Sequence, residues 1–145
     1  MRVMVLVKAS PESEAGVMPS TGLLEAMGRY NEALAQAGVL LGGEGLTPSA
    51  RGARVRLTAD GGAPAVLHGP FAATTELVAG FWLWQVRDMD EALAWARRCP
   101  APMSGGGELE LRPVVEAEDF GEAFTPELRA AEERLRADLA EAGER

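Results

Sequence analysis

The sequence contains a single cysteine, Cys99, and a single histidine, His68, among its 145 residues. One cysteine excludes an internal disulfide and a zinc site built from CxxC pairs. No apolar run approaches the roughly 18 residues of a membrane-spanning helix. No basic run offsets the net charge of −8, which argues against binding to phosphates or anionic lipid. We therefore expect no metal, no membrane partner and no nucleic-acid partner, and we assign no cofactor.

The start of the chain lacks the pattern of a targeting peptide. Arg2 and Lys8 enclose five apolar residues, fewer than the roughly 7–15 in the apolar region of a secretory signal. We therefore expect a cytoplasmic protein. A chain of this length can bury a core without disulfides or metals, so small molecules and other proteins remain as its partners.

The negative charge is concentrated near the C-terminus. Residues 1–115 carry 12 acidic and 10 basic side chains, whereas residues 116–145 carry 10 acidic and 4 basic ones. This difference predicts a folded domain over 1–115 and an acidic linker followed by an amphipathic helix over 116–145. Thr125 and Pro126 are typical of a helix start. The apolar stripe of this helix consists of Leu128, Ala131, Leu135 and Leu139. We expect the stripe to dock on a partner subunit or on its own domain. The alternative is that the helix is a solvated tail.

Within the domain, segments whose apolar residues recur at every second position, as in strands, alternate with segments whose apolar residues recur with the 3.6-residue period of a helix. Ser20 and Asp88 are expected to cap two helices, the first of which runs to Ala37 and ends at Gly38. Residues 10–19 and the glycine-rich residues 42–45 are expected to form turns and loops. Asp60, Gly61 and Gly62 predict a tight hairpin turn. Strands are predicted at residues 2–8, 39–41, 54–59, 64–68, 80–86 and 109–115.

The order strand, helix, strand, hairpin, strand, helix, strand predicts a ferredoxin-like α+β fold, an antiparallel sheet with helices on one face. Two of its strands are apolar on both faces. We expect Met4, Leu6 and at least two of Trp82, Trp84 and Val86 to lie on the face without helices. Because soluble monomers seldom expose large apolar patches, a second copy is expected to cover this face. The sequence thus predicts a homodimer with face-to-face sheets and a cavity between or beside them.

Several segments carry a family resemblance. They are Gly38–Leu46, His68–Ala72 with Thr74 and Glu76, Gly80–Phe81, Asp88–Ala92, Cys99–Pro100 and Glu110–Pro113. In this order and spacing they resemble the YCII-related, DGPF-domain family over about residues 1–115. The resemblance implies a dimeric α/β-barrel of ferredoxin-like subunits. Relatives include enzymes that act on small ring compounds, and many are encoded beside or fused to extracytoplasmic-function sigma factors. His68 stands where the family motif has aspartate.

Three polar residues are candidates for chemistry. His68 is the natural proton carrier near neutral pH, although a turn histidine that merely replaces the aspartate fits equally. Glu76 is the expected partner that orients His68, the alternative being a solvated or helix-capping glutamate. Glu44 lies between glycines that permit close backbone approach to a ligand, or else it is an ordinary hairpin residue. We therefore assign His68 and Glu76 as catalytic and Glu44 as ligand-binding.

Two aromatic residues are candidate ligand contacts. Tyr30 and Trp82 can line an apolar pocket and direct a polar atom at a ligand, but such residues also form cores and dimer interfaces. The run Gly105–Gly107 lacks the GK[ST] ending of a phosphate loop and precedes a strand. Cys99 before Pro100 fits a small buried thiol.

Two classes of function remain open. In one, the dimer binds an apolar or aromatic small molecule and catalyses proton transfer or elimination through His68. In the other, the chain is a non-catalytic module that contacts another protein, for which a sigma factor is the candidate.

Overall fold

The computed structural model describes residues 1–72, 76–102 and 106–144 and divides the chain into two units, Met1–Pro113 and Val114–Arg145. The first unit contains six strands, three α-helices and one 3-10 turn among the described residues. In chain order these elements are β1 (Arg2–Lys8), α1 (Pro11–Glu14), α2 (Thr21–Gln36), β2 (Leu40–Gly45), η1 (Ser49–Arg51), β3 (Ala53–Arg56), β4 (Ala65–His68), β5 (Val78–Gln85), α3 (Met89–Ala96) and β6 (Leu109–Pro113).

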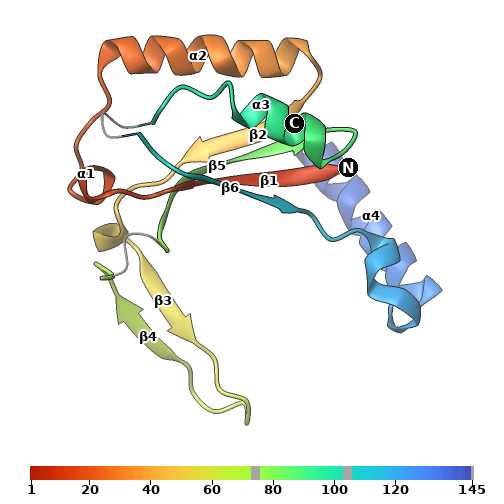
Figure 1. Ribbon diagram of the computed structural model, residues 1–145. Coiled ribbons are helices and arrows are strands. Elements are labelled where there is room, and N and C mark those ends of the chain that lie inside the picture. The colour runs from red at the N-terminus through yellow and green to blue at the C-terminus, as the bar shows by residue number, and fades with distance from the viewer. Residues whose placement is uncertain (73–75, 103–105, 145) are drawn as a thin grey trace. The chain divides into compact units, whose positions relative to one another are not determined.

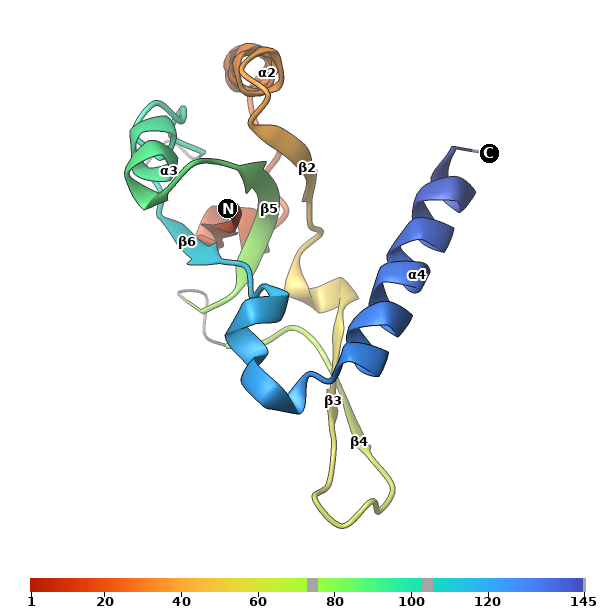
Figure 2. The same cartoon turned by 90° about the vertical axis from the view of Figure 1, so that its right-hand side faces the viewer.

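Four strands form one antiparallel sheet in the order β2-β5-β1-β6. Helix α2 connects β1 to β2, and helix α3 connects β5 to β6, which is the ferredoxin-like arrangement. Both helices lie on the same side of the sheet (Figures 1 and 2). The predicted fold class is therefore confirmed.

Side chains at the predicted cap positions begin the two longer helices of this unit. The Ser20 hydroxyl accepts a hydrogen bond from the Leu23 amide at 3.1 Å, and the Asp88 carboxylate accepts one from the Glu91 amide at 2.9 Å. Gly38 follows α2 with φ of 72°, a left-handed conformation that glycine adopts without steric cost. Residues 10–19, predicted as a loop, contain the one-turn helix α1, whose N-cap is Ser10.

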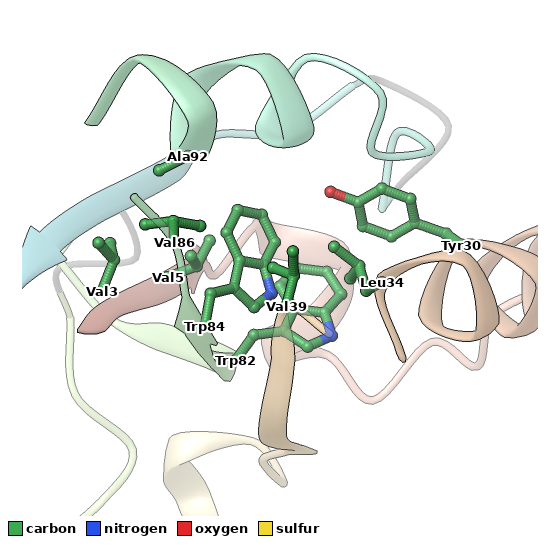
Figure 3. Close-up of a cluster of buried hydrophobic side chains, with 9 residues drawn as sticks. All are labelled: Val3, Val5, Tyr30, Leu34, Val39, Trp82, Trp84, Val86 and Ala92. Atoms are coloured by element: carbon green, nitrogen blue, oxygen red, sulfur yellow. The ribbon is translucent and has the colours of Figure 1, made fainter. Parts of the chain in front are cut away.

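The core lies between the sheet and the two helices (Figure 3). The Tyr30 ring of α2 meets the Trp82 ring of β5 edge-on, with centroids 5.8 Å apart and planes at 78°. Large apolar side chains from both layers are excluded from water here, and this burial drives the association of helices and sheet. The buried residues are Val3, Val5, Tyr30, Leu34, Val39, Trp82, Trp84, Val86 and Ala92.

The prediction for the two sheet faces was wrong in part. Trp82, Trp84 and Val86 lie on the helix-covered face and are 8%, 0% and 4% exposed. Strand alternation groups residues by face but does not say which group the helices cover, and here the large indoles fill the space beneath them.

The opposite face carries the other residues of β1 and β5. Met4 pairs with Leu83, and Leu6 pairs with Phe81, so these four apolar side chains share the face that α2 and α3 do not cover. All four are half-buried. We call this surface the open face.

Strand β2 is longer than predicted. Gly42, Gly43 and Glu44 pair with Leu83, Trp82 and Phe81, so the expected turn at residues 42–45 was wrong. A side chain at position 43 would place its Cβ 2.7 Å from Trp82 Cδ1 and 2.8 Å from the Phe81 carbonyl oxygen. Glycine in this strand therefore permits close packing of the indole, which is a use distinct from turn formation.

The predicted hairpin is a separate two-stranded sheet of β3 and β4. Its last pair is Arg56 with Ala65, so the connection spans residues 57–64 and is longer than predicted. A turn lies within it, and Gly61 has the predicted positive φ, at 76°. In both views the hairpin extends away from the sheet on the side opposite α2 (Figures 1 and 2). We call residues 51–68 the arm.

The second unit contains η2 (Ala117–Ala123) and α4 (Pro126–Gly143). Part of the expected linker is thus a 3-10 segment, whereas the C-terminal helix is confirmed. The Thr125 hydroxyl accepts a hydrogen bond from the Leu128 amide at 3.3 Å, as its cap position predicts. No helix among the described residues is long and apolar enough to cross a membrane.

Two neighbouring glycines of β2 provide a matched test of the packing against Trp82. Gly43→Ala is expected to lower the free energy of unfolding by about 1–3 kcal/mol, because the new methyl group overlaps the indole and a backbone oxygen. Gly42→Ala, which meets no atom within 4 Å, is expected to change it by less than about 1 kcal/mol. Urea denaturation measures both values, and equal effects would contradict this description of the packing.

Candidate functional site

The motif that begins at His68 forms the base of the arm. His68 ends β4, is exposed and pairs with Ala53 of β3. The next amide, that of Gly69, donates a 3.0 Å hydrogen bond to the Gly52 carbonyl. A Cβ at position 69 would lie 1.8 Å from the Ser49 carbonyl oxygen, so no other residue fits here without backbone movement.

Ser49 holds this turn to helix α1. Its amide donates to Glu14 Oε1 at 2.9 Å, and its hydroxyl donates to Glu14 Oε2. The same hydroxyl oxygen accepts a 3.0 Å hydrogen bond from the Phe71 amide. The bond from the Ser49 hydroxyl, followed by that from its amide, lowers the pKa of Glu14 below its ordinary range. We call these three residues the Glu14 clamp.

A cleft of about 390 Å³ lies beside the clamp. The Arg54 guanidinium carbon lies 3.9 Å from the centroid of the Phe71 ring, a cation–π contact at the cleft wall. The remaining lining is mainly apolar and includes Leu46, Pro48, Leu77 and Val78. Phe71 of the motif therefore lines the cleft and also packs its ring against the Arg54 guanidinium group.

A second cavity, of about 360 Å³, lies between helix α2 and strands β2 and β5. We call it the Glu44 groove, since Glu44 is the one acidic residue in its described lining. Its other polar side chain is Asn31, and Gly43 and Gly45 contribute bare backbone. The apolar lining consists of Val7, Pro19, Leu23, Leu24, Met27, Ala79, Phe81, Trp82 and Pro102.

Asn31 has a defined orientation in the Glu44 groove. Trp82 Nε1 donates a 2.9 Å hydrogen bond to Asn31 Oδ1. Because an indole N–H can only donate, the amide oxygen must face it, and the Asn31 amide group keeps its two N–H donors for other partners. The groove thus has an amide donor from Asn31 between apolar walls, and Glu44 of the edge strand completes its lining.

Tyr30 directs its hydroxyl away from the groove. The phenol donates a 2.7 Å hydrogen bond to the Trp95 carbonyl, and burial raises the pKa of Tyr30 above its ordinary value. The hydrogen bond to Trp95 and the edge-on contact with Trp82 make Tyr30 a core residue that links α2 to α3. Trp82 was expected either in the core or in a ligand pocket. It is 8% exposed in the core and it also lines the Glu44 groove.

The open face also carries charge. Lys8 Nζ lies 3.9 Å from Glu110 Oε1, and Arg112 Nη1 lies 3.5 Å from Glu110 Oε2. The Lys8 side chain is 15% exposed, so most of this side chain is withdrawn from water. The face therefore joins a half-buried apolar centre to a row of alternating charges.

The structure does not bring the three predicted polar residues together. Glu44 lines its groove, whereas His68 ends the arm and Glu76 is an exposed turn residue. The side chains of these three residues make no hydrogen bond or ion pair with another described residue. Thr74 of the motif and Gly105 lie outside the described residues. Among those described, no group of three His, Cys, Asp or Glu side chains could hold a metal ion.

The sequence did not indicate Glu14, Ser49 or Asn31 as site residues. Glu14 and Ser49 are 35 positions apart, and Asn31 and Trp82 are 51 positions apart. Only the helix period offered a clue to Asn31, since it lies one turn beyond Met27 on the side that faces the sheet edge. Contacts this distant in sequence have no local pattern.

The clamp predicts a pH-dependent contribution to stability. Since the pKa of Glu14 is lowered in the folded state, its stabilising effect is complete above the ordinary glutamate pKa and is lost as pH falls below about 4. The melting temperature of Glu14→Gln is expected to lie below that of the wild type at pH 7, with the difference shrinking at pH 3.5. Glu25→Gln, on the exposed side of α2, is the control. A difference independent of pH would contradict the clamp.

Comparison with known proteins places the chain in a family. Residues 1–118 match the YCII-related domain. An uncharacterized protein of Rhizobium meliloti (strain 1021) is 37% identical over 70 residues, which are 48% of this chain and 55% of that protein, so the match spans about half of the relative.

One solved structure is also similar. It is 5-chloro-2-hydroxyhydroquinone dehydrochlorinase (TftG) from Burkholderia phenoliruptrix AC1100 in complex with 2,5-dihydroxybenzoquinone. The likeness has a TM-score of 0.46 and 15% identity, and it covers 80% of this chain and 95% of that chain. The match over residues 1–118 confirms the resemblance found in the sequence: the chain belongs to the YCII-related domain family.

Proposed function

We propose that the protein binds a small, largely apolar molecule in the Glu44 groove. The observation that carries this proposal is the composition of the groove, whose lining is apolar except for two polar residues, Glu44 and Asn31, the second of which keeps its amide donors available. Ligand sites typically combine apolar walls with a few fixed polar groups. The cavity of about 360 Å³ is sufficient for a single aromatic ring with substituents.

The polar groups define the chemistry of the ligand. Glu44 accepts a hydrogen bond from a hydroxyl or amine, and the Asn31 amide donates one to a carbonyl or hydroxyl oxygen. Trp82 provides aromatic surface for a flat ring. We therefore propose a hydroxylated or amino-substituted ring compound as the ligand class.

We further propose that a second copy covers the open face. Met4, Leu6, Phe81 and Leu83 form an apolar centre that neither α2 nor α3 covers. Association of two such faces would withdraw these side chains from water, and an isologous pair fits the commonest symmetry of oligomers. The dimer would also restrict access of water to the neighbouring Lys8 and Glu110 side chains.

Proton transfer by His68 with Glu76 stays a prediction, as does the alternative of a non-catalytic module for a sigma factor. In the groove itself, Glu44 is the carboxylate that would accept a proton from a bound hydroxyl. Turnover of a bound ring compound distinguishes the catalytic proposal from simple binding.

Binding in the groove is tested by thermal shift with a panel of hydroxylated aromatic compounds. A ligand present at 100 times its dissociation constant is expected to add about 2.7 kcal/mol to the free energy of unfolding. Glu44→Gln and Asn31→Asp are expected to weaken binding roughly 10- to 100-fold each, through loss of the charged acceptor and of the amide donor. Asn31→Asp keeps the acceptor for the Trp82 indole. Glu32→Gln, on the same helix, is the control, and equal weakening in all three variants would refute the groove.

The dimer is tested by light scattering at micromolar concentration. The wild type is expected at about twice the 15.3 kDa of one chain, and Leu83→Glu is expected near the mass of one chain because it places a charge in the apolar centre. Met18→Glu, at an 81% exposed position away from the sheet, serves as the control and should remain dimeric. A wild type that stays at the mass of one chain would contradict the assembly.

A further inference from the structure

The arm carries exposed apolar side chains. Residues 50–66 are all exposed. Val55 and Val66 are directly paired across the two strands, each 57% exposed, and Leu57 is 80% exposed. Strand alternation places Ala53 and His68 on the same face of the hairpin as the valine pair.

The base of the arm is fixed even though its length is exposed. Hydrogen bonds join the three residues of the Glu14 clamp to one another. A further hydrogen bond, from the Gly69 amide to the Gly52 carbonyl, closes the end of the hairpin. A two-stranded hairpin alone is marginally stable in water. A hairpin that is fixed at its base and apolar along one face is typical of an element that becomes ordered against a partner surface.

The charge of the arm is opposite to that of the rest of the chain. Residues 51–68 carry Arg51, Arg54, Arg56 and one acidic residue, Asp60. All other residues together carry 11 basic and 21 acidic side chains. None of the three arginines forms an ion pair with a described residue. The arm is therefore a basic, partly apolar projection on an acidic protein.

We propose that the arm packs on the acidic surface of a second copy of this chain. Val55 and Val66 would supply the apolar contact on one face of the arm. Arg56, which shares the opposite face with Arg54, would supply ionic contacts together with Arg51 at the base. Arg54 is held against Phe71 and would stiffen the strand between them. The inference rests on the proposed dimer and adds to it a second contact between copies.

Charge complementarity favours a second copy as the occupant. The arm carries three basic side chains and one acidic one, whereas the rest of the chain carries an excess of ten acidic side chains. A second copy offers an excess of carboxylates and is present wherever the chain is. In a symmetric dimer, moreover, each arm meets the same surface, so the contact forms twice.

Photo-crosslinking tests the contact directly. Benzoylphenylalanine is incorporated at position 66 of the full chain, and equal amounts of ¹⁵N-labelled and unlabelled protein are mixed before irradiation. Mass spectrometry is expected to find cross-linked peptide pairs that combine one labelled and one unlabelled copy. The same probe at position 18, which is outside the arm and 81% exposed against 57% for Val66, is expected to give none.

A charge-reversed variant tests the ionic part of the contact. Arg51→Glu combined with Arg56→Glu is expected to lower the yield of mixed cross-links roughly fivefold or more at low salt, since two attractions become repulsions. Arg29→Glu, on α2, is the control and should leave the yield unchanged.

Two outcomes would overturn the inference. Cross-links confined to one copy, or absent from a protein that light scattering shows to be a dimer, would refute the arm contact and leave the sheet-face dimer standing. A wild type with the mass of a single chain would refute both.

Discussion

The indole of Trp82 connects the core of this protein to its candidate binding site. Its ring packs on Gly43 of the edge strand, meets the Tyr30 ring edge-on and donates its N–H to Asn31 of α2. A side chain at position 43 would displace the ring, and loss of the Asn31 oxygen would leave a buried donor unpaired. The neighbouring Trp84 shows the contrast, since its Nε1 has no partner among the described residues and its ring serves packing alone.

The two faces of the sheet have different surroundings. The helix-covered face takes the large aromatic residues and supplies most of the buried area, which makes the unit stable. The open face carries half-buried apolar side chains next to Lys8 and Glu110, and neither α2 nor α3 covers it. The Glu44 groove opens at the edge strand, where glycines in β2 leave the backbone bare. Stability and recognition thus use different parts of one sheet.

The sequence predicted the element order, the helix caps at Ser20 and Asp88 and the C-terminal helix, because these features depend on local periodicity and capping. It assigned Trp82 and Trp84 to the wrong face, since alternation carries no information about where helices lie. Glycines at 42–45 suggested a turn, although Gly43 is required by an indole 39 positions away. Of the candidate site residues, Glu44 and Trp82 line a common groove, whereas Asn31 and the Glu14 clamp depend on long-range contacts without a local pattern.

Trp82 and Asn31 form one wall of the proposed ligand site. Two-dimensional ¹H–¹⁵N NMR resolves the indole N–H signals of the three tryptophans and the side-chain amide of Asn31. On titration with a hydroxylated aromatic ligand, the account predicts shifts for the Trp82 indole and the Asn31 amide, with the buried Trp84 indole unchanged. A ligand that binds and shifts the Trp95 or Trp84 signal while the Trp82 and Asn31 signals stay in place would contradict it.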